Sequence, residues 1–177
     1  FKKNGNIDTQ RSNSFCYKEK NLEAYAQYTY TWDKLVLSAG LRMEYMYTYN
    51  KLNSQTSQDA ETNSQNHFRL FPNLSASYTI NDKNKIALLY SRRQDKPRYE
   101  DLNPFEYLLD ELTYWKGNPF LKPQVSNKIM LSYTWSNLSL NLYYNKLDDY
   151  FTSLTDVYGN NKTIMTTKNI GTQKQVG

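Results

Sequence analysis

The side chains best suited to binding lie between positions 93 and 123, where aromatic, amide and charged residues are interleaved with prolines. Aromatic rings beside amide and carboxylate groups suit sugars and other amphipathic ligands, because a ring offers an apolar face and the amides offer hydrogen bonds. We therefore predict ligand contacts in this stretch. The candidate ligand-binding residues are Tyr114, Trp115, Tyr99, Arg93, Asn103 and Asn118.

The same stretch also supports a purely structural interpretation. Asn-Pro pairs initiate turns and proline fixes the backbone, so we expect residues 94–123 to form an ordered loop despite their length. A small core of its own would consist of Leu102, Phe105, Leu108, Phe120 and Leu121. We favour a packing role for Phe105, Phe120, Pro104 and Pro119, and residues 107–112 are the segment with the best prospect of one helical turn.

Catalysis and metal binding find little support in the sequence. There is one cysteine, Cys16, and one histidine, His67, which is too few for a Cys- or His-based metal site, and no serine has His67 as a partner at a spacing typical of a Ser-His-Asp triad. The pair Asp148-Asp149 fits solvated loop charges better than a catalytic pair of carboxylates. We therefore predict no enzymatic activity, no cofactor and no metal.

Composition narrows the class of protein further. The 177 residues are 38% hydrophobic and 15% aromatic, include 17 tyrosines, and carry a net charge of +5. No run of about 18 apolar residues is present, which excludes a transmembrane helix. The positive charge is mild and is not gathered in a Lys/Arg block, so we expect no nucleic-acid partner. Abundant Tyr with Thr, Ser and Asn favours strands and turns.

A period of two residues dominates the chain and indicates β-strands. Apolar and polar residues alternate through 22–32 and again through 35–47, on either side of Asp33-Lys34. A two-residue hairpin loop pairs the residues that flank it, and here both flanking residues, Trp32 and Leu35, fall on the apolar face. Residues 125–135 and 138–144 repeat the design around Ser136-Asn137.

A third hairpin joins residues 68–80 to residues 86–90. Keeping both apolar rows on one face calls for a three-residue loop, Asp82-Lys83-Asn84, with Asn84 in the left-handed conformation. The three tight turns should lie at one end of the sheet, and the long connections 49–66 and 94–123 at the other. We expect a single domain, 1–177, that is part of a longer protein and divides into hairpins 21–48, 67–93 and 124–150, the long loop 94–123, and an extended ribbon 151–177 that begins the next strand.

A sheet with one apolar face belongs either to a soluble sandwich or to an outer-membrane barrel. Strands of about ten residues, tight turns at one end with long loops at the other, and aromatic residues at both ends of the apolar stripes favour the barrel. The charged residues Arg42, Glu44 and Lys128 should then face the lumen, as wall ion pairs or as substrate contacts, together with Arg69 and Arg93. The residues expected to face lipid are Leu37, Leu41, Leu88, Leu131, Leu140 and Leu142.

Several short motifs resemble one known family. They are Tyr90-Ser91-Arg92-Arg93, Asp101-Leu102-Asn103-Pro104-Phe105, Gly117-Asn118-Pro119-Phe120-Leu121-Lys122-Pro123, Ala24-Tyr25-Ala26-Gln27, Ala39-Gly40-Leu41-Arg42 and Lys168-Asn169-Ile170-Gly171. Across residues 15–177 the chain resembles the outer-membrane β-barrel family of Bacteroidetes, the barrel part of TonB-dependent receptors.

The resemblance implies an all-β, antiparallel, up-and-down transmembrane β-barrel of which this chain supplies a sector of six to eight strands. Such a barrel has about 22 strands, short periplasmic turns and long extracellular loops, and takes up nutrients across the outer membrane of a Gram-negative bacterium. The implied partners are outer-membrane lipid, the rest of the barrel with its plug, TonB acting through that plug, and a surface lipoprotein. The alternative from another class is a soluble β-sandwich adhesin or carbohydrate-binding module.

Overall fold

The computed structural model describes residues 2–3, 6–7, 13–54, 62–158 and 162–177, and most of them are in β-strands. Within the described residues, no helix has the length and apolar character needed to cross a membrane. The elements are β1 (Lys2–Lys3), β2 (Asn6–Ile7), β3 (Asn13–Trp32), β4 (Leu35–Ser54), β5 (Thr62–Asn81), β6 (Asn84–Asp95), α1 (Tyr99–Leu102), β7 (Glu106–Leu108), β8 (Thr113–Lys116), β9 (Gln124–Trp135), β10 (Leu138–Tyr158) and β11 (Lys162–Val176).

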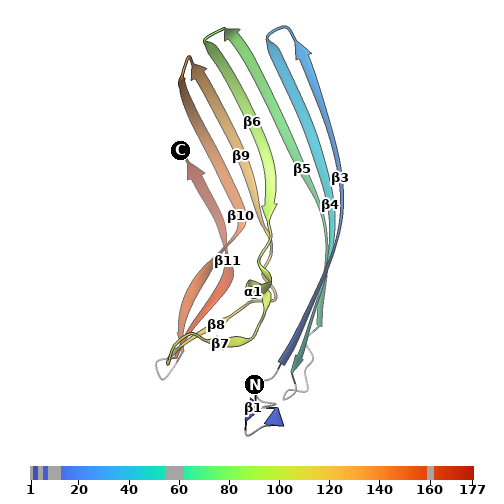
Figure 1. Cartoon of the computed structure of the whole chain (residues 1–177), viewed down its shortest axis with the longest axis vertical. Helices are drawn as coiled ribbons and strands as arrows, with labels where there is room; N and C mark the ends of the chain where they lie inside the picture. Colours follow the sequence, from blue (N-terminus) through green and yellow to red (C-terminus); the bar gives the residue numbers. More distant parts are fainter. Residues whose placement is uncertain (1, 4–5, 8–12, 55–61, 159–161) are drawn as a thin grey trace.

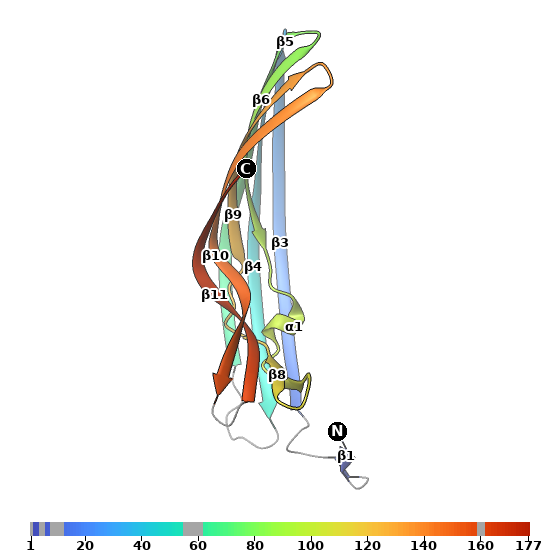
Figure 2. The same cartoon turned by 90° about the vertical axis from the view of Figure 1, so that its left-hand side faces the viewer.

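One long, curved sheet forms the body of the structure (Figures 1 and 2). Its nine strands follow the order β3-β4-β5-β6-β9-β10-β11-β8-β7, while β1 and β2 pair separately. The seven long strands are joined antiparallel in chain order, as an up-and-down barrel wall requires. The sheet is open, with β3 at one edge and β7 at the other, so the predicted all-β barrel sector is confirmed as a fold.

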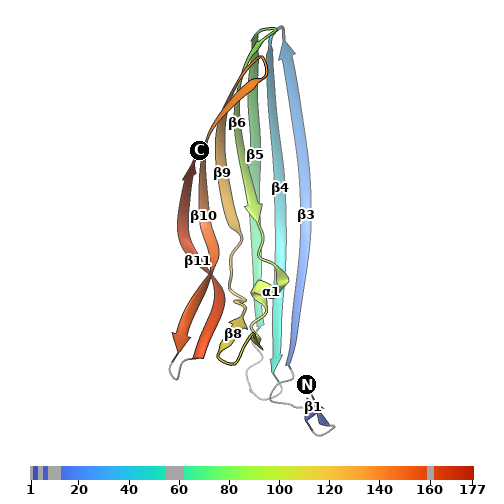
Figure 3. The ribbon, with the colours of Figure 1, turned by 60° about the vertical axis from the view of Figure 1, so that its left-hand side comes forward.

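The tight turns gather at one end of the sheet, at the top of Figures 1 and 3, and the long connection 94–123 lies toward the other end, as predicted. Trp32 pairs with Leu35 and Trp135 pairs with Leu138, which confirms both two-residue loops. The first loop residue has positive φ in each case, 49° at Asp33 and 52° at Ser136. Such a backbone matches the right-handed twist of the flanking strands.

The turn of the middle hairpin differs from the prediction. Asn81 pairs with Asn84, so the loop has two residues, Asp82 and Lys83. The ladder then shifts register between Thr79 and Asn81, and this bulge at Ile80 restores the matching of the apolar rows. Outside glycine, the described residues with positive φ are Asp33, Ser136 and Asp149, so a left-handed Asn84 was wrong.

The strands run well beyond the region where apolar and polar residues alternate. β3, β4 and β5 each contain 20 residues, and β3 starts at Asn13, well before the predicted hairpin 21–48. Spanning a bilayer takes only about 9–11 tilted residues per strand. The alternation of apolar and polar residues ends before the strands do, whereas backbone pairing continues because the neighbouring strand is still present.

The two faces of the sheet have opposite character, and we call them the outer face and the polar face. The six leucines predicted to face lipid are all exposed on the outer face, at 38–58% of their surface. Glu44, predicted for the opposite face, is only 2% exposed, and Phe71 on the same face is 4% exposed. The apolar face of this sheet is thus uncovered, and the polar face is covered around Glu44 and Phe71.

What covers the polar face is the segment 94–123, which we call the lobe. It contains α1, β7 and β8 and is ordered as predicted, although its helical turn is Tyr99–Leu102 and not 107–112. Of the five core residues proposed for it, Leu102 and Leu121 are buried at 5% and 6% exposure and Phe105 is half-buried. Leu108 and Phe120 are exposed at 64% and 56%, which corrects that prediction. The two buried leucines face a hollow shared with Met46 of the sheet, so the lobe packs on the wall more than on itself.

Candidate functional site

Two sequence motifs of the lobe hold each other through backbone hydrogen bonds. The Asn118 N–H donates to the Asp101 carbonyl at 2.6 Å, and the Gly117 N–H donates to the Asn103 carbonyl at 2.9 Å. A Cβ on Gly117 would lie 2.4 Å from that Asn103 oxygen, so only glycine allows the two segments to approach this closely. The residues that carry the family resemblance therefore build one rigid junction.

The amides of Asn103 and Asn118 are both engaged within the protein. Asn103 Nδ2 donates to the Tyr107 hydroxyl at 2.7 Å, and its Oδ1 accepts from the Phe105 N–H at 3.3 Å. Asn118 Oδ1 accepts from the Phe120 N–H at 3.0 Å, while its Nδ2 donates to a β11 carbonyl at 3.3 Å. These bonds give both predicted ligand residues a clear part in folding the lobe.

Asp101 ties the start of the lobe to the far side of the sheet. Its carboxylate is buried, lies 3.0 Å from the Arg98 Nε, and accepts from the Thr167 hydroxyl at 3.4 Å. Thr167 belongs to β11, 66 residues away along the chain. Nearby, the Asn169 side chain of β11 exchanges two hydrogen bonds with the backbone of Lys122, at 2.9 and 3.1 Å. One side of the lobe is therefore fastened to β11.

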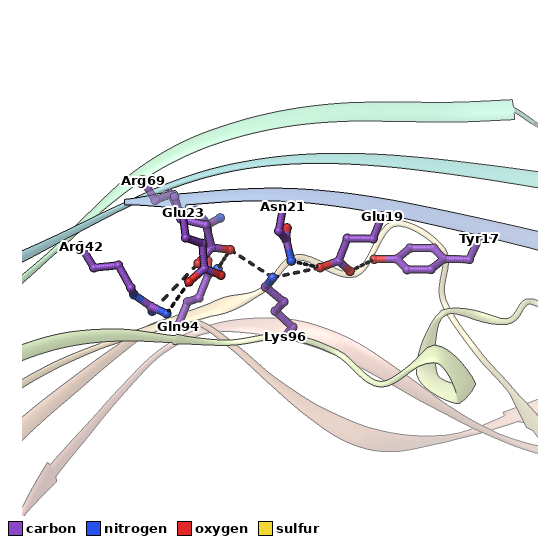
Figure 4. A network of polar contacts seen from close by, with 9 residues as sticks. Tyr17, Glu19, Asn21, Glu23, Arg42, Arg69, Gln94 and Lys96 are labelled. Carbon is purple, nitrogen blue, oxygen red and sulfur yellow. Dashed lines mark hydrogen bonds and ion pairs between the residues drawn. The ribbon is translucent and has the colours of Figure 1, made fainter. Parts of the chain in front are cut away.

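On its other side the lobe is fastened to β3 and β4 by several contacts, among them an ion-pair network centred on Lys96 (Figure 4). The Lys96 Nζ lies 2.9 Å from Glu19 Oε1 and 3.1 Å from Glu44 Oε1. Gln94 extends the network, donating to Glu44 at 2.5 Å and accepting from Arg69 at 2.9 Å. Glu44 is almost fully buried, and the ammonium and amide groups supply the partners that a buried carboxylate needs.

Replacing Lys96 with methionine should loosen the lobe from β3 and β4. The change keeps the length of the side chain but leaves the buried Glu44 carboxylate without its ammonium partner. We expect a loss of about 1–3 kcal/mol in the free energy of docking, seen as faster hydrogen exchange of lobe amides. Lys20→Met, on an exposed lysine of β3, is the matched control. Equal exchange in the two variants would show that Lys96 does not hold the lobe against β3 and β4.

The hairpin β7–β8 lies against β11 and adds a parallel neighbour to it. Thr113 to Trp115 pair with Thr163 to Met165, and the Thr163 N–H donates to the Leu112 carbonyl at 2.8 Å. The Lys162 ammonium lies 2.8 Å from Glu106 and 4.3 Å from the centre of the Tyr114 ring. Glu106 also lies 3.5 Å from Lys116 of β8. Backbone pairing, an ion pair and a cation–π contact together hold this hairpin.

Docking of the hairpin should weaken in acid. The hydrogen bond from Lys162 lowers the pKa of Glu106 below its ordinary value of 4.5. A carboxylate whose pKa is lowered on folding stabilises the docked form above its unfolded pKa, and this contribution disappears as pH falls through the lower value. We expect Trp115 fluorescence, measured with Trp32 and Trp135 replaced by Phe, to show an acid transition below pH 4.5. Glu106→Gln should lack this step; an identical transition in that variant would assign it to another group.

The structure does not bring the six predicted ligand residues into one cluster. Tyr99 donates to the Phe15 carbonyl of β3 at 3.2 Å, whereas Tyr114 and Trp115 lie half-buried on β8, next to β11. Five strands separate β3 from β11 in the order β3-β4-β5-β6-β9-β10-β11. Arg93 is exposed on β6. Tyr114 and Trp115 are consecutive on β8, so their side chains point to opposite faces of that strand.

Sequence reasoning missed the residues that attach the lobe, above all Glu19, Lys96 and Glu106. Their partners are 77, 52 and 56 residues away along the chain, and no local pattern connects them. The charges predicted for a lumen wall are partly found in this network, with Arg42 3.5 Å from Glu23 and Arg69 bonded to Gln94. Across the described ranges, no group of three or more His, Cys, Asp or Glu residues is placed to hold a metal ion.

A family model described as the outer membrane protein beta-barrel family matches residues 2–177. The hemophore receptor HasR of Serratia marcescens, solved as a double mutant with its hemophore HasA and heme, has a TM-score of 0.69 at 14% identity, covering 90% of this chain and 31% of that one. No curated protein matches the sequence.

Two further solved structures have the same architecture. The ferric-catecholate import receptor Fiu from Escherichia coli K12 has a TM-score of 0.59 at 13% identity, covering 92% of this chain and 25% of that one. The siderophore receptor PirA from Pseudomonas aeruginosa has a TM-score of 0.54 at 14% identity, covering 91% of this chain and 39% of that one. This chain thus spans well under half the length of these receptors, and at such identities the likeness concerns the fold.

Proposed function

This chain belongs to the outer membrane protein β-barrel family, and we propose that it forms part of the wall of a TonB-dependent receptor that imports a nutrient. Membership of the family places it in the outer membrane of a Gram-negative bacterium. The soluble β-sandwich, considered above as the alternative, does not agree with this family. Heme, siderophores and ferric catecholates are named for the neighbouring structures.

The observation that carries the proposal is the reversal of the usual burial pattern of a sheet. Leu88, Leu140 and Leu142 are 51%, 58% and 53% exposed on the outer face, while Glu44 on the polar face is 2% exposed. In a water-soluble sandwich the apolar face is covered and the charged face is solvated. Exposed leucines are favourable where lipid surrounds the wall, and a polar face is favourable around an aqueous lumen.

The first set of partners follows from the need to close the barrel wall. Backbone groups in lipid must all be hydrogen-bonded, so the membrane-spanning parts of the edge strands β3 and β11 require further strands. We propose that the remaining strands of the barrel cover these edges, that a plug fills the lumen, and that TonB acts through the plug. A surface lipoprotein is a further candidate partner on the extracellular side.

Within the lumen, Tyr114 and Trp115 remain our candidates for ligand contact. They are adjacent on β8 and half-buried, and the pairing of β8 with β11 holds them on a fixed backbone. Arg93, Tyr99, Asn103 and Asn118 are weaker candidates, the last three because of the structural hydrogen bonds that they make.

The test uses the complete receptor gene in its own bacterium. Deleting the gene should abolish growth on one limiting nutrient from a panel of heme, iron chelates, peptides and oligosaccharides, and restoring it should recover growth. The same restoration in a strain without TonB should fail. Full recovery without TonB would mean that the barrel is a passive pore, and unchanged growth across the panel after deletion would argue against nutrient import.

A further inference from the structure

A hollow lies where the lobe meets the polar face of the sheet. Met46, Asn50 and His67 line it from β4 and β5, and Lys96, Leu121 and Pro123 line it from the lobe. Its enclosed part has room for about two water molecules, and the remainder opens to solvent. The hollow is therefore large enough for a single polar group of a ligand whose other parts stay outside.

One polar atom in this hollow lacks a partner. Asn50 is 7% exposed, and its Nδ2 donates to the Pro119 carbonyl at 3.2 Å. Its Oδ1 is buried and has no hydrogen-bond partner among the described residues. Buried carbonyl oxygens are rarely left unpaired, because desolvation without a hydrogen bond is costly. Asn50 Oδ1 can therefore accept a hydrogen bond from an N–H or O–H group that does not belong to the described residues.

Among the residues that the structure describes, the lining of the hollow carries no free charge. Lys96 is the charged residue on its lining, and its ammonium already faces the carboxylates of Glu19 and Glu44 at 2.9 and 3.1 Å. Burial, and then the nearby cations Arg69 and Lys122, lower the pKa of His67, so its imidazole is neutral at pH 7. An anionic ligand would find no unpaired cation on the described lining, which makes a neutral ligand the better fit.

The rest of the lining matches a group that can both donate and accept hydrogen bonds. Gln65 and Thr48 add an amide and a hydroxyl, and the Gln65 Oε1 lies 3.0 Å from the His67 Nε2. Leu121 and Pro123 add apolar surface on the lobe side. A hydroxyl both donates and accepts, and the C–H face of a sugar ring packs on apolar side chains, so a polyol satisfies this combination.

We propose that this hollow is a binding subsite for a neutral polyol, such as one sugar ring of a larger substrate, with a ligand hydroxyl donating to Asn50 Oδ1. The inference rests on the proposed function, since it concerns what enters the lumen. Because the lining comes from both the lobe and the wall, a bound polyol also bridges the two. Occupancy of the subsite should therefore slow proteolysis within residues 94–123.

The experiment uses the complete receptor in detergent, with methyl α-glucoside and maltotriose as neutral probes and citrate as the anionic one. Saturation-transfer NMR should detect the two sugars and not citrate. Asn50→Leu should weaken sugar binding about three- to tenfold, as expected for one lost hydrogen bond. Asn141→Leu is the matched control, since Asn141 lies on the polar face close to the 136–137 turn and bonds to Ser132. Its binding should equal that of the parent.

A second variant tests the same subsite in case Asn50→Leu misfolds. Gln65→Ala truncates a half-buried side chain at the start of β5 and should also weaken sugar binding, with lobe proteolysis unchanged in the absence of sugar. Absence of sugar signals in the parent, or citrate binding as strong as sugar binding, would overturn the proposal. So would unchanged binding in both variants. TonB-dependent growth on some other nutrient would persist in each of these cases, which separates failure of this inference from failure of the proposed function.

Discussion

Replacing Gly117 with alanine should release the lobe from its folded state while leaving the long strands paired. The added Cβ would lie 2.4 Å from the Asn103 carbonyl oxygen and 2.8 Å from the Asp101 carbonyl oxygen, both of them backbone atoms. The two segments must move apart, which breaks the Gly117 and Asn118 hydrogen bonds. We expect a cost of about 2–4 kcal/mol from overpacking and lost backbone hydrogen bonds together.

Limited proteolysis of the complete receptor measures this effect. Cuts within 94–123 should appear much faster in Gly117→Ala than in the parent, and the heat-resistant barrel band on a gel should persist. Gly40→Ala is the control, because its Cβ would meet mainly the movable Tyr25 side chain, at 3.2 Å. A lobe as resistant as that of the parent would show that the junction of the two motifs does not hold it.

Arginine in place of Leu131 should destabilise the barrel in lipid. Leu131 lies midway along the outer stripe of β9, between its cross-strand neighbours Leu88 and Leu142. Arginine on the lipid face near the middle of the bilayer costs about 2–4 kcal/mol. Folding titrations of the complete barrel in phospholipid vesicles would measure this loss.

Arginine at Ser132, one residue along the same strand, is the matched control. Ser132 lies on the polar face and donates to the Asn141 side chain at 2.6 Å. Its replacement loses one hydrogen bond between neutral groups, worth about 1 kcal/mol, and places the cation toward water. Similar losses at the two positions would contradict the assignment of the outer face to lipid.

Local sequence patterns were sufficient to predict the strands, and the turns between them, where apolar and polar residues alternate. Alternation between two faces depends only on neighbouring residues, and a tight turn fixes register through the pair that flanks it, as Trp32 and Leu35 do. The middle hairpin shows the limit of this reasoning. The apolar rows were matched correctly, but a bulge at Ile80 achieved the match where a longer loop was expected.

Where strands leave lipid, the pattern that identifies them disappears. Residues 13–21 of β3 and 48–54 of β4 are mostly polar and pair throughout. Backbone hydrogen bonds do not require alternating side chains, so only the presence of a partner strand decides how far the ladder extends. This is why the predicted hairpin 21–48 was shorter than the observed one.

The sequence by itself determined the antiparallel wall, its apolar outer face, two of its three tight turns and an ordered loop after β6, because each follows from side chains near one another in the chain. Only the tertiary structure decided where that loop lies and what its motifs do. Lys96 forms ion pairs with Glu19 and Glu44, and Glu106 forms one with Lys162, between residues separated by 52 or more positions in the sequence. Such contacts depend on how the curved sheet brings distant strands around one polar face, and no local pattern of residues specifies that.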